Sequence, residues 1–206
     1  MSALVFEIIL ATSRCWRQWE FDSKVVKFLS IGLWEAYYHK EVNISGSVTN
    51  LLVHVPINST WAISSEFQYL QILIVWAILM NIIVLIFSSV AIKISFMKDP
   101  FTELQIFCYN MSIIILGVTS IFTFIAVSFN YLVDIYGQTT PDFPPYIPVK
   151  KEDIIKKHHT AVLPIGLLTS NMSLFGVIIF FYEMSSIKLQ NKMKAQCASK
   201  LAERKA

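Results

Sequence analysis

Three long stretches without a charged residue dominate the pattern of hydrophobic and polar positions along this chain. They run from 72 to 92, from 104 to 127 and from 160 to 182. At about 1.5 Å per residue in an α-helix, each stretch is long enough to cross the roughly 30 Å hydrocarbon core of a bilayer. Because a backbone in lipid must satisfy its own hydrogen bonds, each stretch is predicted to be a membrane-spanning helix.

The first thirteen residues form a shorter apolar segment, interrupted only by Glu7. A helix from Met1 to Thr12 reaches about 18 Å, which is too short to cross a bilayer. The segment lacks the basic start and the small-residue cleavage site of a signal peptide. Two alternatives stay open. It lies in the membrane interface, or residues 1–13 are the outer part of a first span whose beginning is missing.

The segment from 14 to 71 has a different pattern, rich in β-branched and aromatic residues. Candidate strands lie in 16–21, 25–38 and 48–55, and residues 43–47 have the composition of a turn. The pattern predicts three or four strands of a small antiparallel sheet that stands on the membrane. Such a sheet is marginal alone, so large aromatic side chains are expected to anchor it to the helices.

The segment from 128 to 159 contains four prolines, which predict a stiff, extended excursion. Residues 150–159 are expected to return amphipathically to the last span. His158 and His159 are interpreted as interfacial anchors, because adjacent side chains on a helix point in different directions and do not share a metal.

The sidedness of the segments follows from charge and from glycosylation sequons. Lysine and arginine are denser in the short loop 93–103 and the tail 183–206, which are therefore predicted to be cytoplasmic. The sequons at Asn43 and Asn58 place 14–71, and with it 128–159, on the extracellular side.

The composition agrees with a membrane protein and excludes several other classes. Hydrophobic residues make up 55% of the chain and charged residues 15%, whereas soluble domains carry about 25% charged residues. Cys15, Cys108 and Cys197 lie too far apart to indicate a disulfide or a metal site. The modest, dispersed net charge of +3 gives no support for nucleic-acid binding, and no cofactor is expected.

Trp16 followed by Gly32-Leu33-Trp34, within this order of segments, resembles the claudin family. The resemblance implies a claudin-like four-span membrane helical bundle, here with a shortened first span, and a small extracellular antiparallel β-sheet. It further implies a plasma-membrane protein of tight junctions that forms a paracellular barrier. Partners would be the bilayer, copies of the chain in the same membrane, and claudin-like proteins of the opposite cell.

The chain departs from the family pattern in several places. Tyr37 stands where the family has a cysteine, and no cysteine occurs from 41 to 71, so the family's disulfide is absent. The arginine that the family has near its second span is missing, and Ala206 differs from the apolar final residue of many claudins. The sheet is therefore expected to be held by packing alone or to be looser. If the chain works with three full spans and a short first helix, packing surface is exposed to lipid and lower stability is expected.

Each residue of the motif has a physical interpretation. Gly32 is expected to allow a close backbone approach or a bulge at the end of a strand, and Leu33 and Trp34 to insert at the membrane surface. Glycines in the spans are expected to permit close helix packing. Charged residues of the first segment are candidate pore-lining groups, and their mixed signs predict no ion preference: Glu20, Asp22, Lys24, Lys27, Glu35, Lys40 and Glu41.

Two other functions are weighed. A non-junctional four-span protein, such as a channel accessory subunit or a membrane-organising protein, is favoured by the missing disulfide and the unusual tail. An enzyme is rejected, because the three long runs contain Asn81, Cys108, Asn110 and Asn171 but neither an acid nor a histidine pair.

Overall fold

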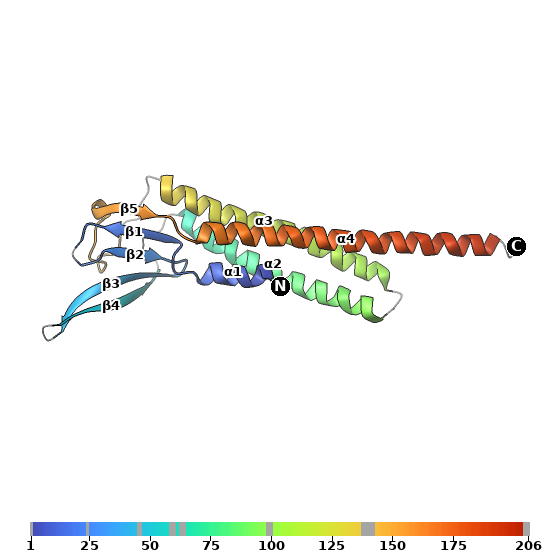
Figure 1. Cartoon of the computed structure of the whole chain (residues 1–206), viewed down its shortest axis with the longest axis horizontal. Helices are drawn as coiled ribbons and strands as arrows, with labels where there is room; N and C mark the ends of the chain where they lie inside the picture. Colours follow the sequence, from blue (N-terminus) through green and yellow to red (C-terminus); the bar gives the residue numbers. More distant parts are fainter. Residues whose placement is uncertain are drawn as a thin grey trace.

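The computed structural model describes residues 2–23, 25–44, 47–57, 61, 65–97, 101–136 and 143–203. Its described helices are α1 (Ser2–Thr12), α2 (Ser65–Met97), α3 (Thr102–Tyr136) and α4 (Val162–Glu203). They run side by side, with a β-sheet at one end and the end of α4 projecting past its neighbours at the other (Figure 1). We call these the sheet end and the tail end.

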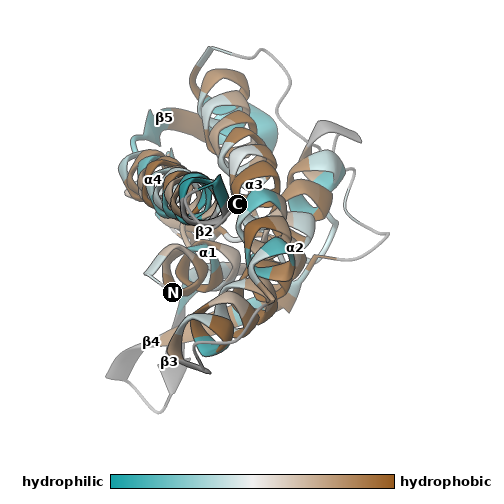
Figure 2. Cartoon of the chain, turned by 90° about the vertical axis from the view of Figure 1, so that its right-hand side faces the viewer, coloured by the Kyte–Doolittle hydropathy of each residue, from teal (hydrophilic) through white to brown (hydrophobic). Residues whose placement is uncertain are grey.

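Helices α2, α3 and α4 are long and apolar enough to cross a membrane. In the most apolar 18-residue stretch of each of these helices, only 28%, 39% and 28% of the residues, respectively, are buried inside the protein. Large apolar side chains such as Trp76, Ile86 and Phe175 are exposed instead, and Figure 2 shows hydrophobic residues recurring along the helices. Such surfaces suit a lipid bilayer and do not suit water.

Each of these helices extends beyond the charge-free run that predicted it. Helix α2 begins at Ser65, α3 continues to Tyr136, and α4 continues through the expected tail to Glu203. A charged residue ends an apolar stretch but breaks no backbone hydrogen bond, so a helix continues past it until the sequence turns the chain. The limits of hydrophobicity are therefore narrower than the limits of the helices.

Helix α1 has 11 residues and packs against α2 and α4 near the sheet end. Its length is about 16 Å, so it covers about half of a hydrocarbon core. The first described residue, Ser2, therefore lies part-way along the bundle (Figure 1). The apolar segment 1–13 is helical from Ser2 to Thr12, and a fourth complete span is not seen among the described residues.

Three or four strands were expected in the segment 14–71. It forms four, and a fifth strand from later in the chain joins them. Strands β1 (Arg17–Phe21), β2 (Phe28–Ile31), β3 (Glu35–Ile44) and β4 (Ser47–Pro56) are followed much later by β5 (Ile154–His158). Within the described residues the antiparallel order is β4-β3-β2-β1-β5. Between Trp16 and Trp34 the chain thus forms strands β1 and β2 and no helix among the described residues.

Strand β5 corrects the expectation of an amphipathic return to the last span. A short 3-10 turn, η1 (Lys151–Asp153), precedes it, and β5 then pairs with β1, with Gln18 opposite His158 and Glu20 opposite Lys156. The lysine-rich run has an amphipathic pattern. The otherwise unpaired edge of β1 nevertheless provides backbone hydrogen-bond partners, which the local sequence does not reveal, and the run pairs with it as a strand.

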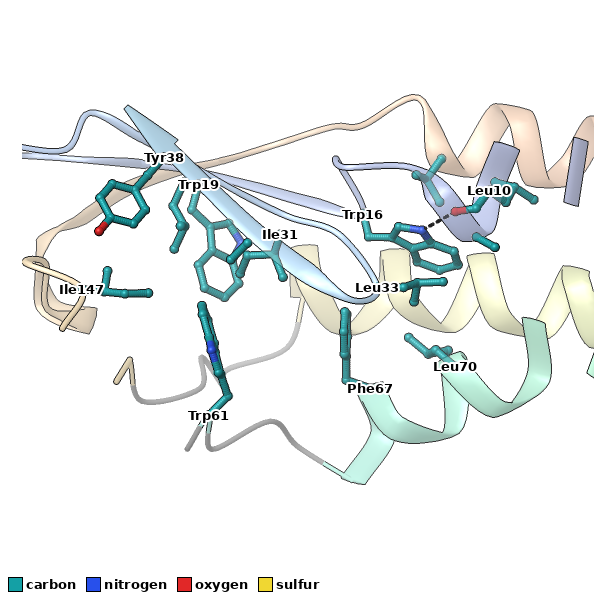
Figure 3. Close-up of a cluster of buried hydrophobic side chains, with 14 of the residues drawn as sticks. Leu10, Trp16, Trp19, Ile31, Leu33, Tyr38, Trp61, Phe67, Leu70 and Ile147 are labelled. Atoms are coloured by element: carbon teal, nitrogen blue, oxygen red, sulfur yellow. Dashed lines mark hydrogen bonds between the residues drawn. The ribbon is translucent and has the colours of Figure 1, made fainter. Parts of the chain in front are cut away.

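The sheet and the helices share one hydrophobic core (Figure 3). Trp16 lies against Leu10 of α1 and above Leu33, while Phe67 and Leu70 of α2 approach from the opposite side. A second, smaller core, near the tail end, contains Ala91, Cys108, Tyr109 and Met184. The sheet has no separate core, because its buried face packs directly on helix ends.

Candidate functional site

The carboxyl end of α1 is closed by the two tryptophans of the motif. The indole Nε1 of Trp16 donates to the Leu10 carbonyl at 2.8 Å (Figure 3). The indole Nε1 of Trp34 donates to the Ala11 carbonyl at 2.9 Å. The last four carbonyls of a helix have no partner within the helix. Trp16 and Trp34 satisfy two of them in a region where little water is available, which ties the sheet to α1.

Gly32 makes this arrangement possible. A Cβ added there would lie 2.8 Å from the Ser13 carbonyl oxygen and 3.1 Å from that of Glu35. The backbone of the link between α1 and β1 therefore passes directly against the turn that connects β2 and β3. The expected close approach is confirmed, and its partner is the chain that leaves α1.

Leu33 and Trp34 do not share the role expected for them. Leu33 is fully buried, and Gln71 of α2 donates to its carbonyl at 2.6 Å. The expectation that Leu33 inserts at the membrane surface is therefore wrong, because it fills the common core. Trp34 is 45% exposed, so one side of its ring faces outward while its nitrogen caps α1.

Buried polar groups form a second connection between the sheet and α3. Asp134 is 4% exposed, and its Oδ1 accepts from Trp19 Nε1 at 2.8 Å. The Lys157 ammonium of β5 donates to the Asp134 backbone carbonyl at 2.6 Å and lies over the Trp19 ring at 5.9 Å. One turn of α3 thus binds both β1 and β5.

Arg17 and Asn130 extend this network by one turn of α3. Arg17 Nε donates to Asn130 Oδ1 at 3.0 Å, and Asn130 Nδ2 donates to the Trp16 carbonyl at 3.1 Å. The buried guanidinium lies 5.1 Å from the ring of Phe67, near the start of α2. A cation beside the start of α2 is therefore present, and β1 supplies it.

The electrostatics of the cluster are dominated by burial. Desolvation lowers the pKa of the Lys157 ammonium below its usual value, and the nearby Arg17 charge acts in the same direction, while the Asp134 carboxylate opposes both. Asp134 lies between the two cations and is the described group that compensates them.

Sequence reasoning missed Asp134, Asn130 and Arg17 as a unit. A signal was available, because Asn130 and Asp134 are four residues apart on one face of a helix. In β1 the alternation of buried Arg17, Trp19 and Phe21 with less buried neighbours marks the face that meets them.

Glu7 is a further missed residue, and it lies inside the helix bundle. Its carboxyl is fully buried and accepts from Asn81 of α2 at 2.6 Å and from Thr123 of α3 at 3.2 Å. The three long charge-free runs contain no acidic residue, and Glu7 was missed because it precedes them. A lone acid in an apolar helix signals an interhelical hydrogen bond.

Tyr37, at the position where the claudin pattern has a cysteine, makes local polar contacts. Its hydroxyl donates to Glu35 at 2.6 Å, and this hydrogen bond is the main reason that the Tyr37 pKa is raised. The guanidinium of Arg14 lies 4.9 Å from the Tyr37 ring, and His54, directly opposite on β4, lies 4.0 Å from Glu35. All three cysteines are free.

The other predicted residues are distributed over the sheet and bundle. Glu20 pairs with His158 at 2.8 Å, while Asp22, Lys27 and Lys40 are exposed. Asn43 lies in β3 opposite Val48. The sequon at Asn58 and the candidate Lys24 lie outside the described residues, as does the Glu41 side chain.

The packing roles predicted for glycines in the long helices are only partly correct. A Cβ at Gly166 would lie 2.2 Å from Val127, and one at Gly176 would lie 3.0 Å from Leu116, so both allow close packing. Gly117 has nothing within 4 Å of that position, and the expectation for it is wrong because it lies on an open face.

Comparison with known proteins does not add an identification. Neither a scan of protein-family models nor a search of curated proteins finds a match for this chain. The function of the chain is therefore inferred from the geometry at the sheet end.

Proposed function

We propose that this chain is a claudin-like integral membrane protein of cell–cell junctions, which contributes to adhesion and to a paracellular barrier. The observation that carries the proposal is the pair of hydrogen bonds from Trp16 and Trp34 to consecutive carbonyls of α1. They give the Trp and Gly-Leu-Trp motif a definite task, which is to hold a sheet upright at one end of the helices.

The layout proposed for the chain is that of the claudin family, with a shortened first span. The sheet faces the extracellular space at the plasma membrane, and α4 ends in the cytoplasm. The order of the elements and the basic residues near the end of α4 support this orientation. The sequon at Asn43, which lies one residue before the end of β3, is expected to be glycosylated if the sheet is extracellular.

The proposed partners are copies of the same chain in one membrane and claudin-like proteins of the neighbouring cell. The surface offered to them is the sheet, whose edge strand β4 has ten residues and carries the exposed Leu51 and Leu52. An uncovered strand edge and exposed leucines are features of a protein-binding surface. The mixed charges of the sheet predict no ion preference.

The proposal is tested by expressing the tagged full chain in cells that lack junctions of their own. We expect enrichment where two expressing cells touch, but not where an expressing cell touches a non-expressing one. Trp34→Phe, which keeps a ring but loses the donor to Ala11, is expected to weaken the enrichment at equal surface level. Uniform surface distribution of the unaltered chain would refute a junctional role.

A non-junctional function as a channel accessory subunit remains the second candidate, because one observation favours it. Tyr37 stands where the family pattern has a cysteine and donates to Glu35 within β3, and all three cysteines are free. Stable co-purification of a channel protein with the full chain, together with uniform surface distribution, would select this function over the first.

A further inference from the structure

The two edge strands of the sheet differ in how well they are protected against pairing with another strand. At one edge, β5 has five residues, carries Lys156 and Lys157, and pairs with β1 through an irregular register. At the other edge, β4 has ten residues, an unbroken register with β3, no acidic residue, no lysine or arginine, and a proline only at its last position. Because short length, lysines and bulges are the features that prevent edge pairing, β4 is the unprotected edge.

Every second residue of β4 directs its backbone N–H and C=O away from β3. The N–H of Ile57 donates to the Trp34 carbonyl at 2.8 Å, in register with the ladder between β3 and β4. Because bonded positions alternate along an antiparallel pair, the odd-numbered residues of β4 bond to β3 and the even-numbered ones face outward. Within the described residues no further strand pairs with this edge. The outward-facing residues before the final proline are Val48, Asn50, Leu52 and His54.

Pairing of β4 with its own copy requires each outward-facing residue to meet another outward-facing residue. In a two-fold antiparallel pair this condition is met when one residue at the centre lies opposite its own copy. A pair centred on Leu52 places Leu51 opposite Val53 of the copy, and the polar Asn50 opposite the polar His54. A pair centred on Leu51 would place Leu52 opposite Asn50 instead. The first register therefore matches apolar with apolar and polar with polar side chains.

The side chains of β4 favour a second copy of the chain as the occupant of this edge. Leu51 and Leu52 are 56% and 47% exposed, and successive residues of a strand point to opposite faces. In the pair centred on Leu52, each leucine gains an apolar neighbour from the copy, so apolar surface is covered on both faces of the joined sheet. His54 lies opposite Asn50 and not opposite itself, so no like charges face each other across the pair.

The direction of β4 decides which membrane the copy occupies. Strands β3 and β4 extend away from the helices (Figure 1). Their Glu35 and Pro56 ends lie nearest α1, because Trp34 caps that helix and accepts from Ile57. An antiparallel copy therefore has its helices on the far side of the paired strands, in a membrane that faces this one. With Pro56 opposite Val48 of the copy, eight residues at about 3.4 Å each separate the two Pro56 positions by about 27 Å.

We propose that β4 binds β4 of a second copy in the opposite membrane, so that the two sheets form one continuous antiparallel sheet centred on Leu52. Main-chain hydrogen bonds hold the two copies together, and the leucines set the register. The inference rests on the proposed function in one respect, which is that the sheet faces the space between two cells. It adds to that function the strand, the register and the identity of the partner.

The test uses two populations of liposomes that contain the full chain with its own cysteines replaced by alanine. One population carries Leu51→Cys and the other Val53→Cys, because these positions lie directly opposite each other, where the strands are closest. Reaction with a membrane-impermeant maleimide identifies the preparations whose sheet faces outward. After mixing and oxidation we expect about tenfold more disulfide dimer than from either population alone. Two copies of the same variant place their cysteines about 7–8 Å apart, which is too far for a disulfide.

Leu52→Lys should prevent the joining of vesicles, because it places two lysines face to face at the centre of the pair. His39→Lys is the matched control. His39 lies directly opposite Leu52 on β3, is exposed, and belongs to a strand with a neighbour on each side. We expect vesicle joining to be lost in the first variant and retained in the second, at equal melting temperatures. If Leu52→Lys fails to fold, the cysteine pair still decides the outcome.

Three results would overturn the proposal. The first is no disulfide dimer between the mixed populations, and the second is an equal yield from either population alone. The third is an equal yield when both variants share one population of vesicles, diluted so that the vesicles do not touch. Enrichment at cell contacts without joining of vesicles would reject this inference and leave the proposed function standing. Joining of vesicles without enrichment at contacts would reject the function and leave the pairing.

Discussion

The sheet end and the tail end of the bundle are built in different ways. At the sheet end, tryptophans, apolar residues and a buried polar network from strands and helices form one continuous core. At the tail end, the described core holds a few buried residues from the three long helices. Helix α4 carries Glu183, Lys188 and Lys192 toward the tail end, so less apolar surface is available for packing there than at the sheet end.

The small sheet is held to the helices without a disulfide. Trp16 and Trp34 connect it to α1, and Trp19 and Lys157 connect it to α3. The expectation of packing alone is therefore incomplete, because buried hydrogen bonds act beside the packing. If this account is correct, changes at the sheet end should cost most, and changes around α1 should cost less.

Trp16→Ala should have the largest effect on the free energy of unfolding. The side chain is 1% exposed and caps α1, and truncating a buried tryptophan typically costs about 3–5 kcal/mol. Thermal unfolding in detergent measures the loss. Trp76→Ala, at a site that is 52% exposed on α2, is the control and should change little. Equal effects of the two substitutions would contradict a special role for the sheet end.

Asp134→Ala should come next, because it leaves Arg17 and Lys157 without their compensating charge. Removing one partner of a buried charged cluster costs about 3 kcal/mol. Hydrogen exchange should show loss of protection in β1 and β5 before the helices, since both strands depend on this turn of α3.

Asp134→Asn separates charge from hydrogen bonding at the same site. It retains an acceptor for Trp19, and Lys157→Met should then remove part of the remaining penalty because it also removes a buried cation. Strictly additive effects of Asp134→Asn and Lys157→Met would show that the charges are not coupled.

Gly166→Ala tests whether close helix packing continues below the sheet. Its Cβ would overlap Val127, and overpacking of this kind costs about 1–3 kcal/mol. Gly117→Ala, at an open position, should be neutral or stabilising by up to about 1 kcal/mol. Val127→Ala in the Gly166→Ala background should restore part of the thermal stability, because it removes both γ carbons of Val127 but leaves its Cβ at 2.8 Å. No recovery at all would locate the strain elsewhere.

Glu7→Leu should have the smallest effect of the series. It removes the acceptor for Asn81 and Thr123, and interhelical hydrogen bonds in membranes average about 0.6 kcal/mol. Glu7→Gln keeps an acceptor and should lie closer to the unaltered chain. A loss as large as that of Trp16→Ala would mean that the middle of the bundle, and not the sheet end, dominates stability.

The amino-acid sequence by itself determined the elements whose cause is local. Long charge-free runs specify helices suited to lipid, because no other backbone structure satisfies its hydrogen bonds there. β-Branched and aromatic residues with a turn between them specify the strands of the first segment. Gly32 was also predictable, because a glycine beside a large aromatic residue signals close backbone approach.

Only the tertiary structure decided which of these elements touch. Arg17 and Asn130 are 113 residues apart, and Trp19 and Asp134 are 115 apart, so no local pattern pairs them. The edge of β1 recruits β5, and the end of α1 recruits two indole donors, because unpaired backbone groups must find partners when water is excluded. Composition states that such partners are needed, and only the folded chain determines which residues supply them.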